Sequence, residues 1–185
     1  MIGVAALDTL QIAANTTNVP GQMSLINISG DVFAVAHSTS TDVGAGVGGG
    51  VVRTFTCDSL GAIGAAQIDS LAFDTLGTTE GPTIRHVSGD IWAIAFIGHP
   101  VTNDKIVVVT VEITSAGAIA AAVTSTATLY TDPTSGLGDT VPFKYVAGSI
   151  YAVAYSDSSG DGFVATFSIT DAGVIGAVIS TLEYE

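Results

Sequence analysis

The loop "DSSGDG", Asp157 to Gly162, carries residue types that bind calcium. Asp157, Ser159 and Asp161 place oxygen atoms at alternate positions, as the first half of an EF-hand loop does. No acidic residue follows at the distance where an EF-hand places its bidentate glutamate. A polar turn explains the same residues without a metal, so we expect this loop to be structural and to supply no metal ligand.

A second stretch, "GAGVGG", has glycines at Gly44, Gly46 and Gly49 that fit the letters of a dinucleotide-binding fingerprint. That fingerprint needs a strand before it and a helix after it, because the helix N-terminus faces the pyrophosphate. The residues that follow are "VVRTFT", which is a strand pattern. We therefore expect a flexible hairpin loop and no bound cofactor.

The histidines do not form a recognisable catalytic group in the sequence. His37 shares its repeat position with Phe96 and Tyr155, His86 shares its position with Tyr145, and His99 lies in a loop that varies. No histidine pair has metal-ligand spacing, and no serine or cysteine lies in a nucleophile turn. Which carboxylates converge in space is left open by the sequence. We expect a protein that is not an enzyme and has no catalytic residue.

The charge balance excludes two classes of partner. Lys and Arg number 4 against 17 Asp and Glu, and the net charge is −13. Nucleic acid and anionic membrane surfaces would repel such a chain. No apolar run reaches the length of a membrane span, and the first residues, "MIGVAALDTL", lack the basic region of a secretory signal. Cys57 is the single cysteine, which excludes an internal disulfide and fits a strand residue.

The composition also predicts extensive contacts. Only 11% of residues are charged, and the mean hydropathy is positive. The apolar residues are interleaved with Thr, Ser and Gly, which is typical of strands and turns. We expect the chain to pack against its own repeats or against other copies.

One phrase occurs three times, as "ISGDVFAVAH" at 28–37, "VSGDIWAIAF" at 87–96 and "VAGSIYAVAY" at 146–155. Its glycines recur at one interval, at Gly30, Gly89 and Gly148. A second anchor has four positions in the order small residue, Gly, Ala or Val, Ile. Its glycines are Gly61, Gly117 and Gly173, and they recur with their own constant interval. Two regular anchors indicate tandem repeats.

The sequence of each repeat predicts four strands. In the middle copy these are "PTIRHV", "DIWAIAF", "KIVVVTVEIT" and "AIAAAVTSTATLY", joined by short connectors or by a variable loop. The pattern predicts an all-β fold of four-stranded antiparallel meanders like β-propeller blades. Phe33, Trp92 and Tyr151 share one position, where we expect them to fill the gap between neighbouring sheets. Stacking on a carbohydrate is the alternative for these aromatic side chains.

The fourth strand occurs once more than the others. It is expected to start at Ile2, Ile63, Ile119 and Ile175, whereas the first three strands occur three times. The chain therefore divides into a surplus strand at 1–13 and repeats at 14–74, 75–132 and 133–185. An unpaired strand exposes open backbone groups, so we expect residues 1–13 to complete a neighbouring blade in another subunit or in an upstream repeat.

The repeat phrase, the Gly and Asp loop, the Thr-rich strand and the endings "LDTLQIAA" and "IDSLAFDT" resemble the tandem repeats of large surface or secreted proteins of bacteria and archaea. The first loop departs from that pattern. The resemblance implies an extracellular structural or adhesive array whose partner is the protein itself. The predicted function is a filament, tube or surface array assembled by strand addition. The alternative is a propeller-type module that binds a glycan or a protein.

Overall fold

The computed structural model describes residues 23–39, 49–75, 77–99, 104–133 and 140–184. The expected strand at 1–13 and the loop glycines Gly44 and Gly46 lie outside these residues. The described residues form three four-stranded antiparallel sheets and contain no helix, which confirms the all-β prediction. They accordingly contain no apolar helix of membrane-spanning length.

Each sheet is a meander in which strands pair in chain order. Sheet 1 consists of β1 (Met23–Ser29), β2 (Val32–Thr39), β3 (Gly49–Thr56) and β4 (Asp69–Asp74). Sheet 2 consists of β5 (Thr78–Ser88), β6 (Ile91–His99), β7 (Lys105–Glu112) and β8 (Ser125–Thr131). Sheet 3 consists of β9 (Phe143–Ala147), β10 (Ile150–Ser156), β11 (Gly162–Ile169) and β12 (Ile175–Tyr184).

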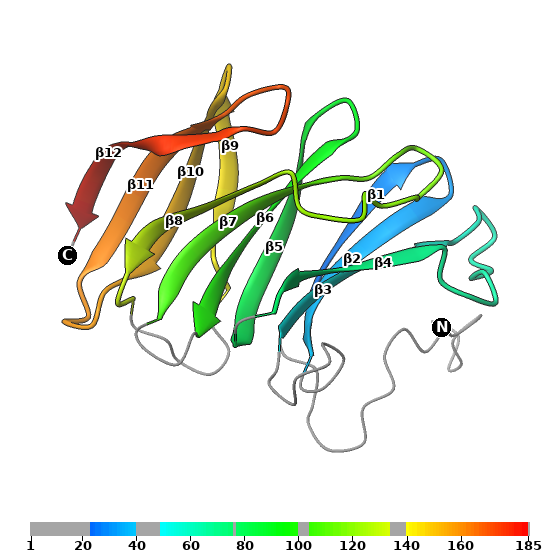
Figure 1. The fold of residues 1–185 in the computed structure, drawn as a ribbon, viewed down its shortest axis with the longest axis horizontal. Helices are drawn as coiled ribbons and strands as arrows, with labels where there is room; N and C mark the ends of the chain where they lie inside the picture. The colour runs from blue at the N-terminus through cyan, green and yellow to red at the C-terminus, as the bar shows by residue number, and fades with distance from the viewer. Residues whose placement is uncertain (1–22, 40–48, 76, 100–103, 134–139, 185) are drawn as a thin grey trace, which may run out of the picture.

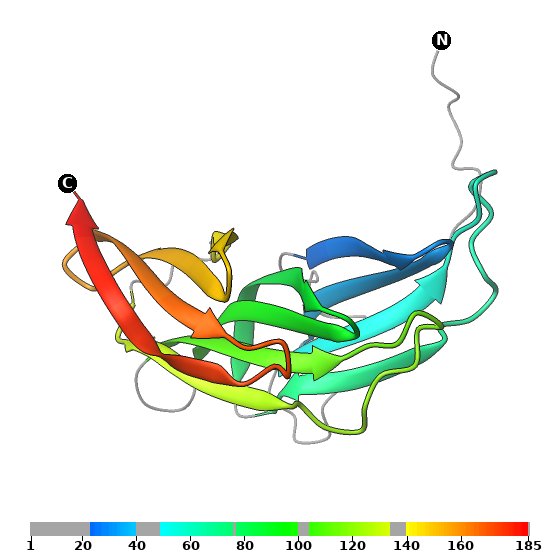
Figure 2. The ribbon, with the colours of Figure 1, turned by 90° about the horizontal axis from the view of Figure 1, so that it is seen from above.

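The three sheets stand side by side in chain order, with sheet 2 in the middle (Figures 1 and 2). The turns after β7 and after β11 each extend toward the preceding sheet (Figure 1). The turn after β3 and the strand β12 lie at opposite ends of the stack (Figures 1 and 2). The sheets therefore follow one another in an open series.

The core consists of two apolar layers, one on each side of sheet 2. Trp92, Ile94 and Phe96 of β6 belong to the layer shared with sheet 1. The intervening residues of β6 belong to the layer shared with sheet 3, namely Ala93, Ala95 and Ile97. Successive residues of a strand point to opposite faces, so a strand covered on both faces reads as a continuous apolar run. Coverage of β6 on both faces therefore explains the continuous apolar run "DIWAIAF".

The fourth strands differ from the prediction in where they begin. Ile63 and Ile119 form only isolated bridges, and β4 and β8 begin at Asp69 and Ser125. Only β12 begins at its isoleucine, Ile175.

β12 differs from β4 and β8 because the segment after its first isoleucine has a different length. Asp69 pairs with Thr54 and Ser125 with Thr110, but the equivalent Thr166 pairs with Ser180. The segment between the isoleucine and this pair is one residue shorter in sheet 3, so it stays against β11 as a longer strand.

Candidate functional site

Trp92 and Tyr151 of the repeat phrase lie in the interfaces between neighbouring sheets, which we name joints. Trp92 is 4% exposed and Tyr151 is 2% exposed, and they belong to the first and second apolar layers respectively. The Trp92 indole N–H donates a hydrogen bond to the Ile113 carbonyl at 3.2 Å. Side chains buried to this degree cannot stack on an external sugar, and their packing between sheets confirms the expectation for both positions. Phe33, in the same position of sheet 1, is half-buried and stacks on Phe55.

A threonine hydroxyl crosses each joint. Thr54 of β3 donates to the carbonyl of Gly117 in sheet 2 at 2.6 Å. Thr110 of β7 donates to the carbonyl of Gly173 in sheet 3, also at 2.6 Å. Both threonines are fully buried, and each bond spans the same 63 residues of sequence. The two joints are therefore built in the same way.

A second side chain binds the same turn two residues further along. Asp69 accepts a hydrogen bond from the Ile119 amide at 2.8 Å, and Ser125 accepts one from the Ile175 amide at 3.4 Å. The sequence separation is again identical, at 50 residues. Sheets 1 and 2 thus each hold the next sheet by a pair of side chains that binds two backbone groups of one turn. We name Thr54 with Asp69, and Thr110 with Ser125, turn-binding pairs.

Glycine is required in the bound turn for two reasons. Gly117 has a φ of 87°, in the left-handed region that L side chains rarely adopt. A Cβ atom there would also lie 2.7 Å from Cδ1 of Ile68, just before β4, and 3.1 Å from Cγ1 of Val32 in β2. The close approach lets the Gly117 carbonyl reach Thr54. In the second and third repeats, the second sequence anchor is therefore the part that docks on the preceding sheet.

The turn-binding pairs belong to a row of residues that runs across each sheet. In sheet 2 the row is Arg85, Ala93, Thr110 and Ser125, which are cross-strand partners in successive strand pairs. Its first member, Arg85, donates from Nε to the Phe143 carbonyl of sheet 3 at 3.2 Å. Arg85 thus contributes to the joint, a role that the sequence did not reveal. We name such a set a joint row.

Sheet 3 has an equivalent joint row on its outer face. Its members, paired in the same way, are Lys144, Ala152, Thr166 and Ser180. Thr166 is partly exposed, and its hydroxyl reaches only the Ser180 carbonyl, at 3.4 Å. Lys144 and Ser180 are exposed. Several large apolar side chains of sheet 3 are exposed as well, namely Val146, Val178, Ile179, Leu182 and Tyr184.

The loop at Asp157 to Asp161 is a closed polar turn. The Asp157 carboxylate accepts hydrogen bonds from the amides of Ser159 and Asp161, at 2.8 and 3.1 Å. The Asp157 amide donates to the Asp161 carbonyl at 3.0 Å. Within the described residues, no group of three acidic, histidine or cysteine side chains could hold a metal ion. Of the glycine-rich stretch, Gly49 is the first residue of β3, so a strand follows as predicted.

The three histidines do not converge. His37 is buried and accepts a hydrogen bond from Nε of Arg53 at 3.3 Å, and its Nδ1 lies 3.0 Å from the Ser38 carbonyl. His86 Nε2 lies 2.8 Å from the Gly89 carbonyl, and its ring packs on Trp92.

His99 lies between two carboxylates, an arrangement the sequence did not predict. Its Nδ1 is 2.6 Å from Asp104 Oδ1, and its Nε2 is 3.4 Å from Glu80 Oε2. Glu80 Oε2 and His99 Nε2 are both buried and make no hydrogen bond. The ends of the β6–β7 hairpin bring His99 and Asp104 together, and β5 supplies Glu80. The cluster brings side chains of the hairpin and of β5 into contact.

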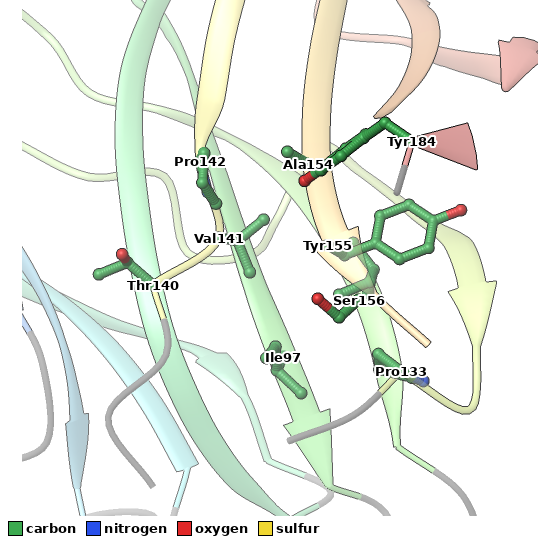
Figure 3. Close-up of a pocket in the computed structure, with 10 residues that line it drawn as sticks. Ile97, Pro133, Thr140, Val141, Pro142, Ala154, Tyr155, Ser156 and Tyr184 are labelled. Atoms are coloured by element: carbon green, nitrogen blue, oxygen red, sulfur yellow. The ribbon is translucent and has the colours of Figure 1, made fainter. Parts of the chain in front are cut away.

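A pocket of about 310 Å³ opens at the lower end of the joint between sheets 2 and 3. Figure 3 shows Pro133, Pro142, Tyr155 and Tyr184 around it, with the hydroxyl of Ser156 among them. Burial chiefly, with the Tyr130 phenol and the Asp157 carboxylate, raises the pKa of Tyr155. The phenol therefore stays neutral at ordinary pH and can donate a hydrogen bond.

The chain matches no protein-family model, no curated protein and no solved structure.

Proposed function

We propose that the protein is a structural repeat protein that self-assembles outside the cell into a filament, tube or surface array. Its sheets act as blade-like units, and further units are added at the ends of the series. The observation that carries this proposal is that two joints are built from equivalent turn-binding pairs, while the equivalent joint row of sheet 3 is exposed.

The geometry of the stack favours an open polymer. A joint that always connects the outer face of one sheet to the turn of the next is heterologous, and such contacts give rings or filaments. The two ends of the described stack lie at opposite sides of the molecule (Figures 1 and 2). The exposed apolar side chains of sheet 3 supply surface for additional contacts, in line with the positive mean hydropathy of the chain.

Strand addition by residues 1–13 is the second part of the proposal. "IGVAALDTLQI" closely matches "IGAAQIDSLAF", which contains β4 and the segment before it. An added strand would gain backbone hydrogen bonds along one side at the edge of a neighbour's sheet. Its position lies outside the described residues, so its role is a prediction from the sequence.

The test is to measure the mass of the purified chain against concentration by light scattering and to image it by electron microscopy. We expect regular polymers, and we expect deletion of residues 1–13 to give monomers or short oligomers with an unchanged β-sheet circular dichroism spectrum. Deletion products with the length and diameter of the intact polymer would refute strand addition. An intact chain that stays monomeric at all concentrations would refute self-assembly.

A second candidate function is supported by the pocket in Figure 3. Its tyrosines and hydroxyl groups provide stacking surfaces and hydrogen-bonding groups of the kind that bind sugars. A glycan array screen would test this binding function, and Tyr184→Ala should abolish any hit. The control is Tyr145→Ala, which removes an exposed tyrosine that does not line the pocket.

A further inference from the structure

We propose that the joint row of sheet 3, with Lys144, Thr166 and Ser180, binds sheet 1 of a second copy of the chain. This inference rests on the proposed self-assembly and names the two surfaces that meet. The row is the tail of the molecule, and the outer side of sheet 1 with the turn at Asp58 to Gly61 is the head. The contact reproduces both internal joints.

The tail carries the residue types that the internal joints use. Thr166 takes the place of Thr54 and Thr110, and Ser180 takes the place of Asp69 and Ser125. Lys144 takes the place of Arg85. The internal threonines are fully buried and bonded at 2.6 Å, whereas Thr166 is partly exposed and makes only the 3.4 Å contact to its own sheet. The tail hydroxyl is therefore placed to donate to a turn from outside.

The head carries the matching turn. Gly61 has a φ of 85°, close to the 87° of Gly117 and the 81° of Gly173. The Gly61 amide donates to the Asp58 carbonyl at 3.0 Å, as the Gly117 amide does to Thr114 at 2.8 Å. The head turn thus has the shape of the turns that dock internally, and Thr166 would donate to the Gly61 carbonyl.

An apolar side chain of the head supports the same contact. Ile84 of sheet 2 and Phe143 of sheet 3 occupy one repeat position, and they are 2% and 0% exposed because each packs in a joint. Leu25 occupies this position in sheet 1 and is 61% exposed. Burying Leu25 against the tail of another copy would remove this apolar surface from water.

Head and tail of residues 1–185 cannot meet each other, because they lie at opposite ends of the stack (Figures 1 and 2). A single chain cannot bring Gly61 to Thr166 without taking its sheets apart. The occupant must present a sheet with the turn and the apolar residue of this repeat. A second copy of the chain presents both.

Blocking each end separately tests the polarity of the contact. Leu25→Arg blocks the head, and Ser180→Arg blocks the tail; both positions are exposed, so the fold should be kept. Sedimentation equilibrium of the full chain should show each variant alone as a monomer. Their equimolar mixture should form a one-to-one dimer, because each supplies the end that the other lacks. Association of either variant alone to the level of the unmodified chain would overturn the proposal.

Removing one hydroxyl tests the hydrogen bond itself. Thr166→Val should weaken association about threefold to tenfold, the effect of one hydrogen bond, and Thr166→Ser should restore it. Thr181→Val is the matched control, because Thr181 is the neighbour of Ser180 on the opposite face of β12. Equal effects of Thr166→Val and Thr181→Val would overturn the assigned contact.

The outcomes separate this inference from the proposed function. If polymers form but none of these variants changes them, self-assembly stands and the head-to-tail contact is wrong. If the intact chain never associates, both are wrong. Unfolding curves of the variants, matched to the unmodified chain, show that any loss of association is not a loss of fold.

Discussion

Replacing the joint threonines by valine measures how strongly one sheet holds the next. Thr54→Val keeps the size of the side chain and removes the hydroxyl that donates to the Gly117 carbonyl at 2.6 Å. That carbonyl then loses the donor it has in the joint. A buried polar group left without a partner costs about 1 to 3 kcal/mol, and we expect Thr54→Val to lower the unfolding free energy by this amount. Thr110→Val should cost the same, since its bond to Gly173 is identical.

Thr166 provides the internal control for this measurement. It occupies the same repeat position but is partly exposed and makes only a 3.4 Å contact, so Thr166→Val should change stability by less than about 0.5 kcal/mol. The assay is urea unfolding at protein concentrations where the chain is monomeric, followed by the fluorescence of Trp92, the single tryptophan. Equal losses at all three threonines, or no loss at Thr54 and Thr110, would refute the assignment of the joint.

The remaining predictions concern packing, backbone, ionisation and salt. Trp92→Ala should lower the unfolding free energy by about 3 to 5 kcal/mol, because it empties the joint between sheets 1 and 2. Urea unfolding of this variant is followed by circular dichroism, because it lacks the tryptophan, and a loss under about 1 kcal/mol would contradict this packing. Gly117→Ala should cost more than Gly89→Ala in the same assay, since both have positive φ but only Gly117 has neighbours within contact distance of a new Cβ. Burial chiefly, with Tyr145 and Asp171, raises the pKa of Tyr151, so its stabilising effect is present below pH 10 and is lost as pH rises through the folded-state pKa. Tyr151→Phe should therefore flatten the fall in unfolding free energy above pH 10, and an unchanged slope would count against it. Because each copy carries a net charge of −13, added salt should raise the polymer mass in light scattering, and a fall with salt would speak against association of like-charged copies.

The sequence was sufficient to predict the features that depend on local chemistry. The repeated glycines at Gly30, Gly89 and Gly148 all adopt positive φ in the turns between first and second strands, as a short hairpin requires. The run "DIWAIAF" indicated a strand covered on both faces, and β6 is covered on both faces.

The start of the fourth strands could not be predicted, because it depends on the neighbouring sheet. The segments after Ile63 and Ile119 repeat a strand-like composition, yet they leave the ladder before Asp69 and Ser125, the residues that bind the next turn. Strand propensity is a property of each segment alone, so it does not reveal that Asp69 and Ser125 bind the turn of the next sheet.

The joint threonines leave a signal in the sequence that belongs to no known motif. Thr54, Thr110 and Thr166 recur in one position of the third strands, which is a regular polar residue within an apolar pattern. Their partners lie in the next repeat, 63 residues away, so only the stacking of sheets shows what they bind. The contact of His99 with Glu80 differs, since it lies within sheet 2 and joins β6 to the adjacent strand β5.

The joints bind main-chain atoms, and this has a consequence for how such repeats can evolve. Thr54 and Asp69 contact a carbonyl and an amide that every sequence of the turn would present, provided that glycine is kept. The side chains of the turn are therefore free to drift, as the change from Ala118 to Val174 beside the two docked glycines illustrates. Repeats that have diverged in sequence, or that belong to different chains, would remain interchangeable, and mixed fibres could grow from several related subunits.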